Sequence, residues 1–452
     1  MKRQKALLLG VILLVGTFTG CKVEKKEYNV STNNPEIYQR SVKKLTDIIV
    51  YDIFSPPVAA RIYAYPNIAA YEVLVNEYPS YISLSGQLRG LNGVSTPNNQ
   101  ETYCFPLAAN QAFVKVARAL IFSEDKMDQY IDEMHNMYHE LGVPKEVFKR
   151  SVEYGDQVAS EILAWAENDN YKETRTFPKY TVRTDTEFWK PTPPDYMEGI
   201  EPHWNKIRLF VLDSANQFIP EPPTEFNMDS TSQFYKELME VYNTGVNLSE
   251  EEEEIAKFWD CNPYVSHHAG HAMFATKKIT PGGHWIGITA IATRNSNSDL
   301  METINAYTRV SITLHDAFIS CWDEKWRSIL VRPETLINQY IDEKWVPLLQ
   351  TPPFPEYTSG HSVISTAAAV ILTDIYGDSF RFEDTTEMEY GLPSRTFNSF
   401  LEASQEAAIS RLYGGIHYMP AIENGVTQGK NIGEYIIKNL ETKGKNRLSK
   451  LN

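Results

Sequence analysis

The spacing of apolar residues is the feature that most constrains the fold of this chain. From Pro35 onward they recur at intervals of three and four, beginning with Ile37, Tyr38, Val42, Leu45, Ile48, Ile49 and Ile53. This period places one apolar stripe along a helix. Similar stretches cover 58–77, 107–121, 125–140, 146–166, 299–330, 334–349, 360–376, 397–413 and 424–441, while alternating strand patterns are scarce. The sequence therefore predicts an all-α protein, one helical assembly in two halves.

A proline-rich segment interrupts this helical pattern. Prolines cluster between 171 and 228, at positions 191, 193, 194, 202, 220, 222 and 223, with aromatic residues between them. This composition predicts a long irregular excursion within an N-terminal helical region at 35–245. A C-terminal helical bundle is assigned to 246–445. Ser249 precedes the glutamates Glu250 to Glu254, which we interpret as a capped helix start and not as a metal site, because the helix dipole favours carboxylates there.

Composition excludes several classes of function. With 42% hydrophobic residues the chain can bury a sizeable core, so a disordered chain is excluded. A net charge of -15, with no basic stripe, argues against nucleic acid as a partner. The 4 cysteines contain no Cys-x-x-Cys pair, which excludes a zinc ribbon and a dithiol redox site.

The N-terminus carries the features of a secretion signal. Basic residues at positions 2, 3 and 5 precede an apolar run from 6 to about 15, and Cys21 follows the small residue Gly20. This arrangement resembles a bacterial lipoprotein signal. The resemblance implies a signal peptide at 1–20, lipidation of Cys21, a tether at 21–34, and an envelope location that is periplasmic or at the cell surface. Simple secretion with a different cleavage point is the alternative.

Three short segments in the second half of the chain carry the candidate chemistry. Lys325 and Arg332 are seven residues apart, which predicts that both project from one helix face before Pro333 ends that helix. The second segment, 359–361, reads Ser-Gly-His and stands at a predicted helix N-terminus, where free N–H groups attract an anion. In the third, Arg411 and His417 flank a Gly-Gly pair that predicts a helix end. Three cations, two histidines and no carboxylate describe a site for a tetrahedral oxyanion.

The ordered triple resembles the signature motifs of the type 2 phosphatidic acid phosphatase and vanadium-dependent haloperoxidase superfamily, whose fold is an α-helical bundle. The resemblance implies that His417 is the vanadate ligand of a haloperoxidase, or the nucleophile that forms phosphohistidine in a phosphatase. It implies that His361 is the general acid–base and that Lys325 polarises bound peroxide. The residues implied to hold the oxyanion are Lys325, Arg332, Ser359, Gly360 and Arg411.

Two positions depart from the usual motifs. Thr358 stands where the family has proline before Ser-Gly-His, a change that affects loop stiffness more than chemistry. Ala421 stands where an aspartate usually follows the last histidine by four residues. In phosphatases that aspartate orients the nucleophile, so its absence weighs against the phosphatase interpretation unless Glu423, or a carboxylate from another helix, replaces it.

An aromatic pair favours the haloperoxidase interpretation. Trp322 and Phe354 stand before the first and second motifs, a placement that resembles the aromatic pair near the halide site of fungal vanadium chloroperoxidases. The alternative is that both rings only pack the bundle.

The predicted function is a vanadate-dependent haloperoxidase-like enzyme that oxidises halide with hydrogen peroxide. The first alternative is an acid phosphatase that acts on phosphomonoesters or lipid phosphates and needs no cofactor. The second is a non-catalytic phosphate-binding surface lipoprotein, although two histidines are more than a binder needs. The identity of the halide and the oligomeric state stay open.

A separate group of histidines has spacing that suggests a metal site. His267 and His271 are one helical turn apart, His268 lies between them, and His284 follows a Gly-Gly pair. No glutamate accompanies them as in zinc proteases, so a supporting or pocket-lining role is the preferred interpretation.

Overall fold

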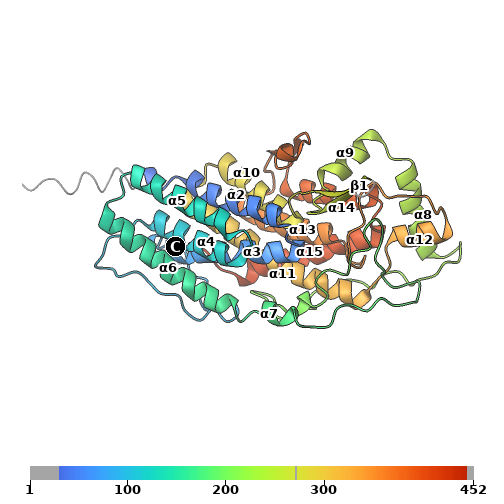
Figure 1. Ribbon diagram of the computed structural model, residues 1–452, viewed down its shortest axis with the longest axis horizontal. Helices are drawn as coiled ribbons and strands as arrows, with labels where there is room; N and C mark the ends of the chain where they lie inside the picture. Colours follow the sequence, from blue (N-terminus) through green and yellow to red (C-terminus); the bar gives the residue numbers. More distant parts are fainter. Residues whose placement is uncertain (1–29, 270–271, 445–452) are drawn as a thin grey trace, which may run out of the picture.

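The structure, a computed structural model, describes residues 30–269 and 272–444 (Figure 1). The predicted signal peptide, the lipidation site Cys21, residues 21–29 of the tether, and His271 lie outside the described residues. The N-terminal helices are α2 (Pro35–Asp52), α3 (Pro56–Leu74), α4 (Phe105–Leu120), α5 (Glu124–Glu140) and α6 (Lys145–Ala166). The long C-terminal helices are α10 (Pro281–Asn295), α11 (Leu300–Ser328), α13 (Gly360–Tyr376), α14 (Phe400–Tyr413) and α15 (Met419–Asn439).

Shorter elements connect these helices. They are α7 (Tyr171–Thr174), α8 (Gln233–Val246), α9 (Glu250–Phe258), α12 (Pro333–Tyr340) and the 3-10 turns η1 (Val75–Glu77), η2 (Trp204–Lys206) and η3 (Met388–Tyr390). Two antiparallel hairpins complete the described part: β1 (Val265–Ala269) pairs with β2 (Ala272–Thr276), and β3 (Phe382–Asp384) pairs with β4 (Arg395–Phe397). In the first hairpin Val265 lies opposite Thr276, and in the second Phe382 lies opposite Phe397. The prediction of a helical bundle is confirmed.

Helix α11 forms the centre of the core. Nearly all of its residues from Leu300 to Trp322 are buried, and it packs against α3, α10 and α13. Polar contacts through Asn67 of α3 join it to its neighbours: Asn67 Nδ2 donates to Ser311 Oγ of α11 at 3.2 Å, and Asn67 Oδ1 accepts from Tyr38 Oη of α2 at 2.6 Å. Helix α11, which carries Lys325 near its C-terminal end, is therefore held in place by helices on several sides.

Asp316 of α11 anchors the irregular excursion. Its carboxylate accepts three backbone N–H groups, those of Phe210, Val211 and Leu212, at 2.8 to 2.9 Å. Complete burial raises the pKa of Asp316 to about 6, although the three N–H groups oppose that shift. Apart from α7 and η2, residues 171–228 contain no helix or strand, as the proline cluster predicts.

Glycines on one face of α15 bring that helix close to α13. Gly425, Gly429 and Gly433 recur every four residues, and a Cβ on Gly425 would lie 2.8 Å from Ser362 Cβ and 3.0 Å from the Ser359 carbonyl oxygen. A Cβ on Gly429 would overlap the carbonyl oxygen of Val363. Only glycine permits this approach, and it sets the start of α13 against the start of α15.

Several boundaries differ from the sequence-based predictions. Helix α12 ends at Tyr340 and not near 349, because Asn338 Nδ2 donates to the carbonyl oxygens of Asp342 and Trp345 and turns the chain. Helices α8 and α10 and both hairpins were not predicted. The capped start of α9 is confirmed: Ser249 and Glu252 form a capping box.

The predicted common helix for Lys325 and Arg332 is wrong. Helix α11 ends at Ser328, where Ile329 adopts a left-handed conformation with φ of 51°, and Arg332 caps the start of α12. The helical spacing suggested for the group of histidines is also wrong. His267 and His268 belong to β1 and not to a helix, and His284 lies on α10. In the described part of the chain, no helix is both long and apolar enough to cross a membrane.

We expect Gly429→Ala to destabilise the protein. The added methyl group would overpack the α13–α15 contact and lower the free energy of unfolding by about 1–3 kcal/mol. Chemical denaturation followed by circular dichroism measures this difference. Gly93→Ala is the matched control, since nothing lies within 4 Å of a Cβ there. Equal stability of the two variants would contradict close packing of the helices.

Candidate active site

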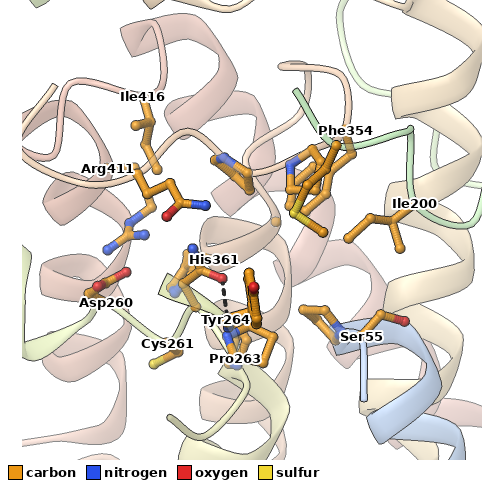
Figure 2. A pocket seen from close by; sticks show the side chains of 18 of the residues that line it. Ser55, Ile200, Asp260, Cys261, Pro263, Tyr264, Phe354, His361, Arg411 and Ile416 are labelled. Atoms are coloured by element: carbon orange, nitrogen blue, oxygen red, sulfur yellow. Dashed lines mark hydrogen bonds between the residues drawn. The ribbon is translucent and has the colours of Figure 1, made fainter. Parts of the chain in front are cut away.

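A cavity of about 700 Å³ opens where the three motifs meet. Gly360, His361, Arg411 and His417 line it, and Lys325, Arg332 and Ser359 contact these residues from behind the wall. The remaining walls come mainly from the excursion and from loops 260–264 and 350–354. Figure 2 shows His361 in the middle, with Arg411 and Asp260 on one side and Phe354 and Ile200 on the other.

Lys325 fastens the loop that precedes α13. Its Nζ donates to the carbonyl oxygens of Pro355 at 3.0 Å, Glu356 at 3.0 Å and Thr358 at 2.5 Å. All three ammonium hydrogens are therefore engaged with backbone. Complete burial lowers the pKa of Lys325 to about 8. The side chain thus contributes charge to the site while it shapes the loop.

Arg332 faces the imidazole of His417. Its Nη1 lies 3.1 Å from His417 Nε2 and 2.8 Å from the Ile416 carbonyl oxygen, and its Nε donates to the Phe354 carbonyl oxygen at 3.0 Å. Its buried Nη2 has no hydrogen-bond partner among the described residues. Burial lowers the pKa of Arg332 to about 10, although Glu356 opposes the shift.

Glu356 determines the tautomer of His417. Its Oε1 lies 2.7 Å from His417 Nδ1 and accepts the backbone N–H of Tyr418 at 3.0 Å. Because a guanidinium can only donate, the Nε2 that faces Arg332 carries no hydrogen, and Nδ1 donates to the carboxylate. Burial, then Arg332 and Lys325, hold the pKa of His417 well below its usual value. The ring is therefore neutral, with its Nε2 lone pair directed at the cations.

The Glu356 carboxylate takes the place of the aspartate that is missing at Ala421. The carboxylate that the motif lacks is supplied by the loop before α13, and not by Glu423. Sequence reasoning did not assign a role to Glu356, although it lies three residues before Ser359. The missing aspartate was the only signal that could have prompted a search for it.

His361 lies in the first turn of α13. Its ring hydrogen-bonds the Trp259 backbone, and its Nε2 is buried without a partner among the described residues. Burial, followed by the charge of Arg411, places the pKa of His361 well below its usual value. A neutral imidazole with a free Nε2 on the cavity wall can take up or release a proton.

Ser359 and Gly360 form the helix start that was predicted. The Ser359 side chain accepts the Ser362 N–H at 3.3 Å as the N-cap of α13. A Cβ on Gly360 would come to 3.9 Å from both the Lys325 side chain and the Trp322 ring. Gly360 thus leaves room for a ligand to approach the helix N-terminus.

Arg411 projects from the last turn of α14. Its Nη2 donates to the Trp259 carbonyl oxygen at 2.8 Å and its Nε to Ser410 Oγ at 3.1 Å. Burial lowers the pKa of Arg411, while the nearby Asp260 and Cys261 raise it. The predicted helix end between Arg411 and His417 is confirmed, since α14 stops at Tyr413 and Gly415 has a φ of 75°.

The two predicted aromatic residues form one wall of the cavity. The rings of Trp322 and Phe354 have centroids 5.0 Å apart, and Phe318 lies 5.4 Å from Trp322. Trp322 Nε1 donates to the Ile200 carbonyl oxygen at 3.3 Å, which ties this wall to the excursion. The structure therefore brings the aromatic pair beside the motifs.

The site keeps unused hydrogen-bonding capacity for a ligand. Lys325, Arg332 and Arg411 are all buried, and buried carboxylates lie near each of them, of which Glu356 contacts His417. Arg332 Nη2 and His361 Nε2 have no partner among the described residues, so both can still bond a bound anion. This donor set suits a tetrahedral oxyanion such as vanadate or phosphate.

Comparisons with known proteins agree with this geometry. The family model described as the VCPO second helical-bundle domain matches residues 305–444, which contain all three motifs. The crystal structure of the first bacterial vanadium-dependent iodoperoxidase is 52% identical, with a TM-score of 0.87, and the match covers 92% of this chain and 99% of that one. A search of curated proteins finds no match.

Two more distant structures share the fold. The holo and apo forms of a bacterial vanadium-dependent chloroperoxidase are each 15% identical to this chain, with TM-scores of 0.65 and 0.63. The matches cover 86% of this chain and 93% and 95% of theirs. On the identity and full-length coverage of the iodoperoxidase match, the chain is an enzyme of the vanadium-dependent haloperoxidase family.

Proposed function

We propose that this enzyme binds vanadate through His417 Nε2 and oxidises halide with hydrogen peroxide. The observation that carries the proposal is the His417 imidazole, which Glu356 holds in the tautomer whose unprotonated Nε2 faces the guanidinium of Arg332. When bound, vanadate would activate peroxide as a Lewis acid without a change of its own oxidation state.

The proposed roles of the other residues follow from their positions. Arg332 and Arg411 offer guanidinium hydrogens to the oxyanion, and Lys325 supplies positive charge. The Gly360 N–H lies in the first turn of α13, where the helix dipole favours an anion. His361 Nε2, which has no partner among the described residues, accepts or donates the proton exchanged when peroxide enters.

We propose iodide as the halide. The iodoperoxidase structure that covers 92% of this chain supports this choice. The wall made by Trp322 and Phe354 is apolar and polarisable, a surface that suits a large soft anion better than a small hydrated one. The location proposed for the enzyme is the bacterial envelope, through a lipid on Cys21.

Hydrolysis of phosphomonoesters is a second candidate. Glu356 supplies the carboxylate contact that a phosphohistidine nucleophile needs, so the absence of aspartate at Ala421 no longer weighs against it. An aryl phosphate assay beside the halide assay separates the two activities.

We expect peroxide-dependent oxidation of iodide only after orthovanadate is added to anion-stripped protein. His417→Ala should abolish the activity because it removes the proposed ligand, while His139→Ala, an exposed change on α5, should leave it intact. Triiodide absorbance measures the rate, with bromide in parallel. Phosphate release inhibited by vanadate, with no halide oxidation, would instead establish the phosphatase.

Glu356→Gln should weaken vanadate binding about 10- to 100-fold, the usual effect of losing a carboxylate behind a metal-bound histidine. Vanadate titration of the stripped enzyme, followed by recovered activity, measures the affinity. Glu334→Gln is the matched control, because Glu334 is also a buried carboxylate near Arg332 but does not contact His417. Equal losses in both variants would show that general charge, and not the contact with His417, matters.

Oxyanion affinity should fall as pH rises through about 8, where the buried Lys325 loses its proton and the site loses one positive charge. Below that pH the charge is present, so affinity is highest there. Tungstate is the suitable probe, since it keeps its own charge across this range. Isothermal titration of Lys325→Met should show a lower affinity without the fall near pH 8. A fall near pH 8 that persists in that variant would assign the titration to another group.

A further inference from the structure

A second cluster of chemically reactive side chains lies behind the cavity wall. It comprises Cys261 in the loop after α9, His284 on α10, and Asp384 and Glu387 around the end of β3. All four are buried, and none takes part in the proposed halide chemistry. Cys261 also lines the cavity, so the cluster and the active site share this segment (Figure 2).

Three side chains of the cluster direct ligand atoms toward one point. His284 Nδ1 lies 3.4 Å from Cys261 Sγ and 3.3 Å from Glu387 Oε1, and the three ligand atoms all lie within 4.8 Å of one another. A tetrahedral zinc ion, with bonds of about 2.0 Å to nitrogen and oxygen and about 2.3 Å to sulfur, holds its ligand atoms about 3.3–3.6 Å apart. The observed separations around His284 Nδ1 match these values.

The other nitrogen of His284 is already fixed. Nε2 lies 2.8 Å from Asp384 Oδ2 and 2.7 Å from Thr386 Oγ1, and that hydroxyl itself donates to Asp384 Oδ1. Nε2 therefore carries the hydrogen and leaves the Nδ1 lone pair facing Cys261 and Glu387. A carboxylate behind a histidine is the usual support of a metal-bound imidazole.

Glu387 provides the independent evidence for a cation. Its side chain is fully buried, yet neither carboxylate oxygen has a hydrogen-bond partner among the described residues. A buried carboxylate without partners is costly, and a cation between it and Cys261 would remove that cost.

We propose that Cys261, His284 and Glu387 bind a zinc ion. A sulfur, a nitrogen and an oxygen ligand suit zinc, whereas magnesium and calcium take oxygen ligands almost exclusively. Of the histidines in the sequence-predicted group, this assignment uses His284. Glu387 either binds through both oxygens or leaves one position to water.

The zinc ion would position the cavity wall and take no part in oxidation. Trp259 stacks on the His284 ring with centroids 4.5 Å apart, and its carbonyl oxygen accepts from Arg411. The metal would thus fix the segment from Trp259 to Cys261, against which Arg411 and His361 are oriented.

Metal analysis of the purified full chain tests the proposal without any turnover. We expect about one zinc ion per chain after dialysis, and the same uptake of cobalt with a thiolate-to-cobalt charge-transfer band in the near ultraviolet. Cys261→Ser and Glu387→Gln should lose the zinc, and Asp384→Asn should weaken its binding about 10- to 100-fold. Cys104→Ser, a buried cysteine of the N-terminal region, is the control and should keep it.

Each other outcome overturns the assignment. A wild-type chain that takes up neither zinc nor cobalt would mean that a protonated His284 pairs with the two carboxylates and no metal binds. Zinc retained equally by Cys261→Ser and Cys104→Ser would place the metal elsewhere. If the cluster variants do not fold, the cobalt spectrum of the wild-type chain decides, since absence of the thiolate band excludes Cys261 as a ligand.

Discussion

The burial of positive charge around His417 is the constraint on which the rest of the site depends. Lys325, Arg332 and Arg411 are removed from water, and each recovers hydrogen bonds from backbone carbonyl groups. Those carbonyls belong to the loops before α13, after α14 and after α9. The charges that attract an oxyanion therefore also hold the loops in place. A change to one of these side chains alters both the charge of the site and the shape of the cavity.

Close helix packing supplies the rigidity that this arrangement needs. Helix α11 is buried along most of its length and delivers Trp322 and Lys325 at its C-terminal end. The glycine face of α15 draws the start of α13 to within backbone contact, which sets His361 beside the segment that carries His417. A tetrahedral anion needs donors from several directions, and here α11 and α14 end, and α12, α13 and α15 begin, around the cavity.

The sequence predicted the helical class and the motif residues because both depend on local patterns. Apolar periodicity located α2, α11 and α13 closely, and the cap at Ser359 marked a helix start. Prediction from these local patterns failed where a long-range contact decides the local structure. The left-handed turn at Ile329 separates Lys325 from Arg332, and nothing in the residue spacing reveals it. The partner of His417 was missed for the same reason, since the contact joins positions 61 residues apart.

Glu356 shows why the missing aspartate is tolerated. Its backbone N–H donates to the Leu330 carbonyl oxygen at 3.0 Å, its carbonyl oxygen accepts from Lys325, and its carboxylate holds His417. A residue fixed at both backbone groups loses little further freedom when its side chain makes a contact. An acceptor on this loop can therefore orient the imidazole as firmly as one on α15. Ala421 is fully buried, and its backbone carbonyl oxygen accepts the Ser359 N–H, which joins the start of α15 to the start of α13.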